Sequence, residues 1–258
     1  MNLKNQLLGK KVIVTGASRG LGESICYTLA ESGAEIAMIS RSKDEMEKIR
    51  KKIINSNDHI SIKLDLLSIS KISYAIKKAK KFLKNIDIVL HIAGGGLGLK
   101  DPLLNYKDFN KLLNTNLVSV AEINRQVIKN KTPNEELKLI HIGSIASSEA
   151  VGSVGYNVAK SALSAYVRSI GRELYKKNVI ATGILPGGFI APGNAMFRFK
   201  IKNIKDYKKF IKKRLPRNKM GDASEIIPII LFLCSQHASM MGGCMVPIDA
   251  GEGIAYQL

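Results

Sequence analysis

Cysteine is scarce in this chain of 258 residues, which contains only Cys26, Cys234 and Cys244. They are scattered and odd in number, without the spacing of metal ligands, so we expect neither a disulfide framework nor a metal site. No apolar run approaches the ~20 residues of a membrane-spanning helix, and the N-terminus lacks the apolar core of a signal peptide. These absences predict a cytoplasmic protein with no membrane partner.

Acidic residues are also few. The chain contains 21 Asp and Glu but 40 Lys and Arg, which gives a net charge of +19. Such a charge is compatible with a nucleic-acid or membrane surface. The basic residues are spread along the chain, however, with denser stretches at Lys77–Lys84 and Arg198–Arg217, and no basic motif is interleaved with aromatics. We therefore predict no nucleic-acid partner and attribute the charge to a lysine-rich composition with anionic ligands. A phosphorylated substrate or an acidic carrier stays open.

Short apolar runs alternate with segments of helical spacing along the chain. This alternation predicts βαβ units and a parallel sheet covered on both faces. We predict one α/β domain over residues 1–258, a Rossmann-type doubly wound fold with about seven strands. The predicted strands are Lys11–Thr15, Ala34–Ser40, His59–Leu64, Ile86–Ala93, Lys138–Ile142, Val179–Leu185 and Gly243–Ile248. The predicted helices are Leu21–Gly33, Asp44–Asn55, Ser68–Asn85, Phe109–Lys129, Tyr156–Lys176 and one that opens with a capping box at Asp222–Glu225.

The segment from Pro186 to Pro216 breaks this rhythm. It is long, contains several aromatic residues, and is basic over residues 194–217. Insertions of this length between a strand and the next helix are usually functional, so we predict a lid. The alternative is a surface excursion that supports contacts between subunits.

A glycine-rich loop follows the first predicted strand, with the sequence Thr15-Gly-Ala-Ser-Arg-Gly-Leu-Gly22. Its glycines allow a tight turn and let the backbone approach a pyrophosphate at the N-terminus of the next helix. The strand before it and the helix after it distinguish this loop from a chance glycine pattern. We predict a dinucleotide site here rather than a purely structural turn.

The end of the second predicted strand indicates which dinucleotide binds. NAD-preferring Rossmann domains place an acidic residue there, whereas this chain has Ser40 and Arg41, with no carboxylate until Asp44. Arg19 adds a second guanidinium from the glycine loop. Two arginines suit the 2′-phosphate through charge-assisted hydrogen bonds, so we predict NADP(H) as the cofactor.

Tyr156 and Lys160 are four residues apart at the start of a predicted helix, so they share one face. An ammonium beside a phenol favours the phenolate and lowers a pKa that starts near ~10. The pair therefore suits acid/base chemistry. Ser144, just after the fifth predicted strand, lies where its hydroxyl could reach the same pocket.

With these motifs in view, the chain resembles the short-chain dehydrogenase/reductase family. The motifs that carry the resemblance occur in the family's order. They are the glycine loop, Asp65-Leu66, Ala93-Gly94, Asn116, Ser144, Tyr156, Lys160, Pro186-Gly187, Arg214-Leu-Pro, Met220-Gly221 and Asp249-Ala-Gly251. The resemblance implies that Tyr156 donates a proton to a carbonyl oxygen that Ser144 binds. It implies that Lys160 holds the nicotinamide ribose and lowers the Tyr156 pKa, and that Asn116 anchors a relay water. The expected cofactor-binding residues are Gly16, Ser18, Arg19, Gly20, Leu21, Gly22, Ser40, Arg41, Asp65, Leu66, Ala93, Gly94, Tyr156, Lys160, Pro186, Gly187 and Phe189.

Three positions depart from the family pattern. His91-Ile-Ala-Gly94 replaces the usual Asn-Asn-Ala-Gly, and we interpret His91 as a core histidine rather than a polar substitute. Ala191 stands near the place of the family's threonine, so one contact to the cofactor amide is lost or moved to the backbone. Ala250 replaces a glycine. None of these changes removes a catalytic residue, and we expect an active enzyme.

Two subgroups of the family supply substrate hypotheses. The general resemblance is to 3-oxoacyl carrier-protein reductases. Four segments instead resemble PtmA-type oxidoreductases of surface-glycan synthesis. They are His91-Ile-Ala-Gly-Gly, Asp101-Pro-Leu, Glu122-Ile-Asn-Arg125 and Pro186–Asn194. We favour a sugar or nucleotide-sugar substrate, and keep open the ketoacyl thioester and a non-catalytic NADP-binding regulator. The resemblance also implies a homotetramer or homodimer built through the helices near Phe109–Lys129 and Tyr156–Lys176.

Overall fold

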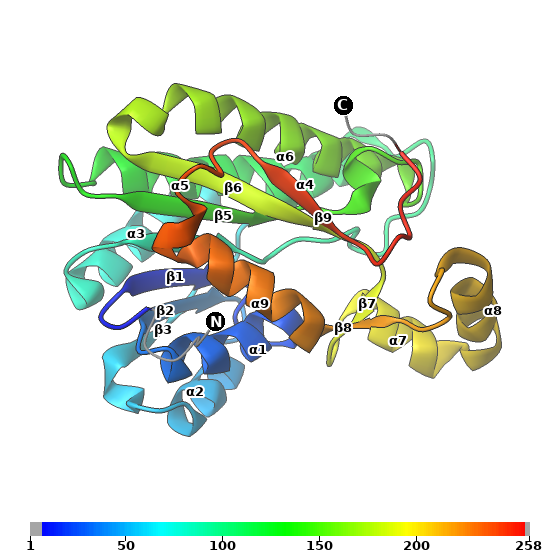
Figure 1. Cartoon of the computed structure of the whole chain (residues 1–258), viewed down its shortest axis with the longest axis horizontal. Coiled ribbons are helices and arrows are strands. Elements are labelled where there is room, and N and C mark those ends of the chain that lie inside the picture. Colours follow the sequence, from blue (N-terminus) through cyan, green and yellow to red (C-terminus); the bar gives the residue numbers. More distant parts are fainter. Residues whose placement is uncertain (1–6, 256–258) are drawn as a thin grey trace.

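The structure is a computed structural model that describes residues 7–255 (Figure 1). Seven parallel strands form its main sheet, in the spatial order β3-β2-β1-β4-β5-β6-β9. They are β1 Lys11–Thr15, β2 Glu35–Ser40, β3 His59–Lys63, β4 Ile88–His91, β5 Leu137–Ile142, β6 Val179–Pro186 and β9 Met245–Ile248. The order reverses between β1 and β4, which creates the crevice where doubly wound folds bind ligands. The predicted fold class is confirmed.

Helices cover both faces of this sheet, as the alternating pattern predicts. One core joins the sheet to α1 Gly20–Glu31, α2 Lys43–Lys52 and α9 Ala223–Cys234; the other joins it to α3 Ile69–Leu83, α5 Ser119–Lys129 and α6 Val154–Glu173. Successive strand residues alternate between the two cores: Val12 and Val14 enter the first, and Ile13 enters the second. All three side chains are fully buried, and each such burial contributes about 1.5–3 kcal/mol.

The helix predicted over Phe109–Lys129 is instead interrupted. It consists of α4 Tyr106–Leu113, a π-helical segment at Asn114–Val118, and α5. The Asn116 amide donates to the carbonyl oxygen of Leu112, four residues back, at 3.0 Å. Single π-helical turns are often found at functional sites, and this one directs Asn116 toward the loop after β4.

The segment predicted as a lid contains two helices and a short strand. Strand β7 Phe189–Ile190 pairs in parallel with β8 Gly221–Asp222, and helices α7 Ala195–Lys202 and α8 Ile204–Arg214 follow β7. Phe199 packs edge-on against Tyr207 and Phe210, with ring centroids 5.9 and 6.3 Å apart. Figure 1 shows this α7–α8 segment projecting beyond one end of the main sheet.

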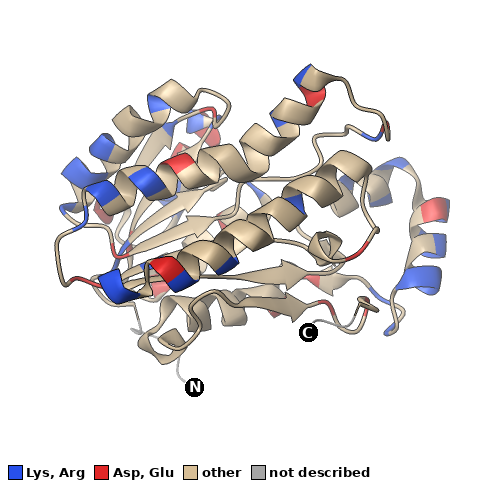
Figure 2. Cartoon of the chain, turned by 90° about the horizontal axis from the view of Figure 1, so that it is seen from above, with Lys and Arg blue, Asp and Glu red and all other residues tan. Residues whose placement is uncertain are grey.

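Four short 3₁₀ turns complete the described secondary structure, at Ser56–Asp58, Ile145–Ser147, Tyr175–Lys177 and Gln236–Ala238. The predicted capping box is confirmed, because Asp222 accepts from the backbone of α9 while Glu225 accepts from the Asp222 N–H. Basic residues occur on helices at opposite ends of the molecule (Figure 2), and α8 is rich in them. Within residues 7–255 no helix has both the length and the apolar content to cross a membrane.

Candidate active site at the carboxyl edge of the sheet

The glycine loop between β1 and α1 has a conformation that requires its glycines. Gly16 has a φ of +74°, and a Cβ there would lie 2.8 Å from the backbone nitrogen of Ala93. A Cβ on Gly22 would lie 2.1 Å from the Gly16 carbonyl oxygen. Because α1 begins at Gly20, its free N–H groups face this tight turn. The loop is therefore a cradle that fits a pyrophosphate.

The loops after β1 and β2 are tied together by a hydrogen bond of 2.7 Å between the hydroxyls of Ser18 and Ser40. Next to these serines in sequence are Arg19 and Arg41, and both side chains are exposed. Arg19 and Arg41 therefore follow directly after two serines that are in contact, on adjacent loops. Their free guanidinium groups suit a phosphate rather than a ribose hydroxyl.

The remaining predicted nucleotide residues lie at the same edge. Asp65 is exposed after β3, where its Oδ1 accepts from the Leu67 N–H at 3.0 Å. Leu66 packs against the neighbouring core. Ala93 and Gly94 follow β4, and the parallel register brings the end of β4 beside the end of β1.

Tyr156 lies in the first turn of α6, and a hydrogen bond joins it to Ser144, the residue that caps the 3₁₀ turn after β5. Burial raises the pKa of the Tyr156 phenol, and the Ser144 hydrogen bond opposes that rise. The phenol therefore carries its proton at neutral pH.

The effect of Lys160 on the pKa of Tyr156 differs from the sequence-based expectation. Its ammonium donates to the carbonyl oxygen of Ile142 at 2.8 Å and lies 5.8 Å from the centre of the Tyr156 ring. Burial lowers the pKa of Lys160 to about 8. The expectation that Lys160 lowers the Tyr156 pKa is therefore not met in this structure, because desolvation dominates the titration of both groups.

Asn116 is buried and makes three hydrogen bonds. Its Oδ1 accepts from the Gly95 N–H at 2.9 Å, and its amide donates to the carbonyl oxygens of Gly95 and Leu112. A Cβ on Gly94 would lie 2.8 Å from Asn116 Oδ1 and 3.3 Å from Lys160 Nζ. The π-helical segment thus places Asn116 against the backbone of Gly94 and Gly95, and Gly94 lies close to both Asn116 and Lys160.

His91 is a core histidine, as interpreted from the sequence. Its ring stacks on that of His141 at 4.8 Å, and its Nε2 lies 2.7 Å from Asn124 Oδ1. Because His141 Nδ1 must donate to the carbonyl oxygen of Thr182, its Nε2 accepts from the Asn124 amide. Burial lowers the pKa of both histidines, that of His141 to about 4. Both rings are neutral at neutral pH, and they belong to the buried core near Lys160.

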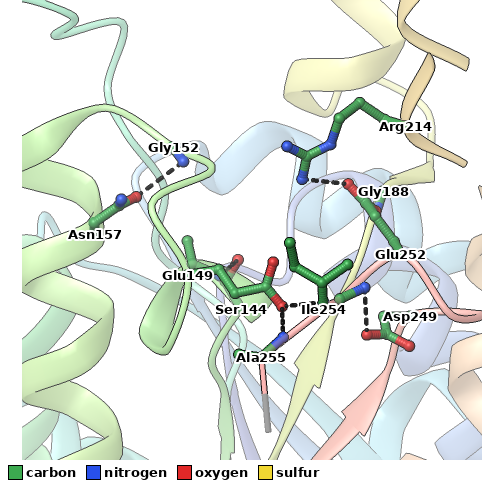
Figure 3. A network of polar contacts seen from close by, with 12 residues as sticks. Ser144, Glu149, Gly152, Asn157, Gly188, Arg214, Asp249, Glu252, Ile254 and Ala255 are labelled. Atoms are coloured by element: carbon green, nitrogen blue, oxygen red, sulfur yellow. Dashed lines mark hydrogen bonds and ion pairs between the residues drawn. The ribbon is translucent and has the colours of Figure 1, made fainter.

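Two carboxylates that the sequence analysis did not single out, Glu252 and Glu149, form hydrogen bonds with the loop after β6 and with the C-terminal tail (Figure 3). Pro186 ends β6, Gly187 and Gly188 follow, and Phe189 begins β7. Glu252 accepts a hydrogen bond from the Gly188 N–H, and Glu149, five residues after Ser144, accepts from Ile254 and Ala255. No local spacing predicts these contacts. Among residues 7–255, no group of three or more His, Cys, Asp and Glu is arranged to hold a metal ion.

Comparison with known proteins identifies the family. A family model described as enoyl-(acyl carrier protein) reductase matches residues 16–252. The chain belongs to the short-chain dehydrogenase/reductase family. A curated member, 3-oxoacyl-[acyl-carrier-protein] reductase FabG of Buchnera aphidicola subsp. Baizongia pistaciae, is 32% identical, over 94% of this chain and 96% of that protein.

Solved structures of short-chain dehydrogenase/reductases share the fold. A putative gluconate dehydrogenase from Agrobacterium tumefaciens superposes with a TM-score of 0.88 at 26% identity, covering 98% of this chain and all of that one. A 7α-hydroxysteroid dehydrogenase complexed with NADH and a 7-oxo bile acid gives 0.87 at 26% identity, covering 99% of this chain and 97% of that one. This short-chain dehydrogenase/reductase is therefore an oxidoreductase that interconverts an alcohol and a carbonyl group.

Proposed function

We propose that the protein is an NADP(H)-dependent carbonyl reductase in which Tyr156 is the acid/base, with residues 1–258 acting as one NADP-binding domain. The observation that carries this proposal is the convergence of Tyr156, its hydrogen-bonded partner Ser144, and the buried Lys160 beside the glycine loop. A bound nicotinamide supplies the hydride. Ser144 binds the carbonyl oxygen and Tyr156 gives it a proton, while Lys160 holds the nicotinamide ribose and Asn116 anchors a relay water.

The raised pKa of Tyr156 indicates which proton transfer this residue is ready to perform at neutral pH. Reduction needs a protonated phenol to donate to the developing alkoxide, whereas oxidation needs a phenolate to take the proton of the alcohol. Because burial keeps the proton on Tyr156, the reduction is the direction for which this residue is prepared.

For the cofactor, we propose NADP(H) over NAD(H). Arg19 and Arg41 lie on loops joined by the Ser18–Ser40 hydrogen bond, and their guanidinium groups would hold the 2′-phosphate. The glycine cradle would hold the pyrophosphate, Asp65 and Leu66 the adenine, and Pro186, Gly187 and Phe189 the nicotinamide end.

For the substrate, we propose a sugar or nucleotide sugar of surface-glycan synthesis. Figure 3 shows the carboxylates of Glu149 and Asp249 together with Ser144. Both accept hydrogen bonds from backbone N–H groups near the C-terminus, and carboxylate oxygens can also accept from hydroxyl groups. The putative gluconate dehydrogenase is named for a sugar acid. The second candidate is a 3-oxoacyl carrier-protein substrate, which the name of the 32% identical relative favours. The basic α7–α8 segment suits a diphosphate or an acidic carrier equally.

The test measures NADPH consumption with a nucleotide-sugar ketone and with a ketoacyl thioester, for the wild type and Tyr156→Phe in parallel. We expect turnover of the sugar, and a fall of roughly 10²–10⁴-fold in the variant. Turnover of the thioester alone would select the second candidate. Tight NADPH binding with no tyrosine-dependent turnover would favour a non-catalytic regulator.

We also propose that the protein forms a homotetramer or homodimer through α4, α5 and α6. Apolar side chains are exposed on or beside these helices, at Leu103, Tyr106, Val118, Val154 and Val158. Analytical ultracentrifugation of the wild type and Val158→Glu would test this surface, and a monomeric wild type would refute it.

A further inference from the structure

Glu252 is a buried carboxylate at the junction of three segments (Figure 3). Its side chain is only 4% exposed. One oxygen, Oε2, accepts from the Gly188 N–H at 2.5 Å, and the other, Oε1, lies 3.6 Å from Arg214 Nη2. Burying a carboxylate is costly unless it is hydrogen-bonded and paired with a charge, and here both conditions are met.

The loop after β6 is shaped to receive this carboxylate. A Cβ on Gly187 would lie 2.8 Å from Glu252 Oε2, and one on Gly188 would lie 3.2 Å from it. The close approach of backbone and carboxylate therefore depends on the two consecutive glycines. This is the loop proposed to receive the nicotinamide end of the dinucleotide.

The cation that pairs with Glu252 comes from the α7–α8 segment. Arg214 is the last residue of α8, so its ion pair fixes the end of that helix against the loop after β6. The tail that carries Glu252 is held in turn, because Glu149 accepts from the N–H groups of Ile254 and Ala255. One carboxylate thus joins the projecting segment to the candidate cofactor loop.

We propose that Glu252 is a positioning residue for the cofactor site. Its carboxylate holds the Gly187–Gly188 loop in the conformation that receives the nicotinamide end of NADPH, and through Arg214 it couples this loop to the position of the α7–α8 segment. The inference rests on the proposed function, because it takes this loop to be part of the dinucleotide site.

The test compares Glu252→Gln, Arg214→Gln and the double variant with Arg217→Gln as a matched control. Gln keeps an acceptor for the Gly188 N–H but removes the charge that Arg214 needs. Arg217 lies three residues after the end of α8 and also forms a tight ion pair, but with Glu225 of α9, at 2.6 and 2.7 Å. The first readout is the NADPH dissociation constant by fluorescence, and the second is the rate of trypsin cleavage within α7–α8 with and without NADPH.

We expect each of the two single variants to weaken NADPH binding roughly tenfold. Glu252→Gln replaces the charge-assisted hydrogen bond from Gly188 by a neutral one, and Arg214→Gln leaves the buried Glu252 charge without its cation. The double variant should be little worse than either single one, because both changes break the same pair. NADPH should protect the segment from trypsin in the wild type and Arg217→Gln but much less in Glu252→Gln. Arg214→Lys, which restores the charge, should recover most of the affinity.

Unchanged NADPH affinity and protection in folded Glu252→Gln and Arg214→Gln would overturn the inference. If Glu252→Gln does not fold, Arg214→Gln decides alone, since that side chain is partly exposed. A wild type that fails to bind NADPH refutes the proposed function and the inference together. A wild type that binds and turns over NADPH, with variants that match it, refutes only the inference.

Discussion

The burial of Lys160 should make the stability of the protein rise with pH above about pH 8. Its pKa falls from 10.5 to about 8 in the folded protein, and each pKa unit corresponds to 1.36 kcal/mol. Below pH 8 both states carry the charge, so the folded state bears the full cost of burying it, on the order of 3 kcal/mol. Between pH 8 and 10.5 the folded state releases the proton while the unfolded state keeps it, and stability rises.

Urea unfolding of the wild type and Lys160→Met at pH 7.5, 9 and 10 measures this contribution. The methionine has a similar length and no charge, and the titrations of all other groups cancel in the difference. We expect Lys160→Met to be more stable than the wild type at pH 7.5 and to lose most of that advantage by pH 10. A difference that stays constant across this range would refute the assignment of a buried ammonium to Lys160.

Three further predictions concern the site. Because the Tyr156 pKa is raised, the ratio of alcohol oxidation to carbonyl reduction should increase steadily with pH toward pH 10, as initial rates in both directions will show; a flat ratio contradicts Tyr156 as the titrating group. Arg41→Ala should lower the preference for NADPH over NADH on the order of tenfold in paired binding titrations, whereas the nearby exposed Lys43→Ala should not. Gly22→Ala should abolish dinucleotide binding, because its Cβ would lie 2.1 Å from the Gly16 carbonyl oxygen; binding with wild-type affinity would show that the cradle is not the site.

The fold and much of the candidate site follow from local sequence signals. Short apolar runs predict all seven strands of the main sheet. In a central strand such as β5, burial on both faces leaves little choice of composition. The glycine loop is predictable because the φ of +74° at Gly16 favours glycine and the close contact at Gly22 leaves no room for a Cβ. The capping box formed by Asp222 and Glu225 predicts the start of α9. In each case the determining contacts lie within a few residues.

Features that depend on tertiary contacts were not predictable in the same way. The π-helical segment arises because Asn116 bonds both Leu112 and Gly95, the second of which lies 21 residues away. The acid/base character of Tyr156 and Lys160 is expected from their spacing, but the direction in which each pKa moves depends on burial. Spacing places two groups on one face, whereas desolvation is a property of everything that packs around them.

The carboxylates around the loop after β6 show why sequence separation matters more than residue type. Glu252 contacts Gly188 across 64 residues, and Glu149 contacts Ile254 across 105. In the sequence both look like ordinary surface charges, because Asp and Glu are rarely buried without a partner. The chain has 40 basic and 21 acidic residues, so most carboxylates could find a cation at the surface. Glu252 is instead buried against two glycines, and these glycines form the loop beside the proposed hydride-transfer site.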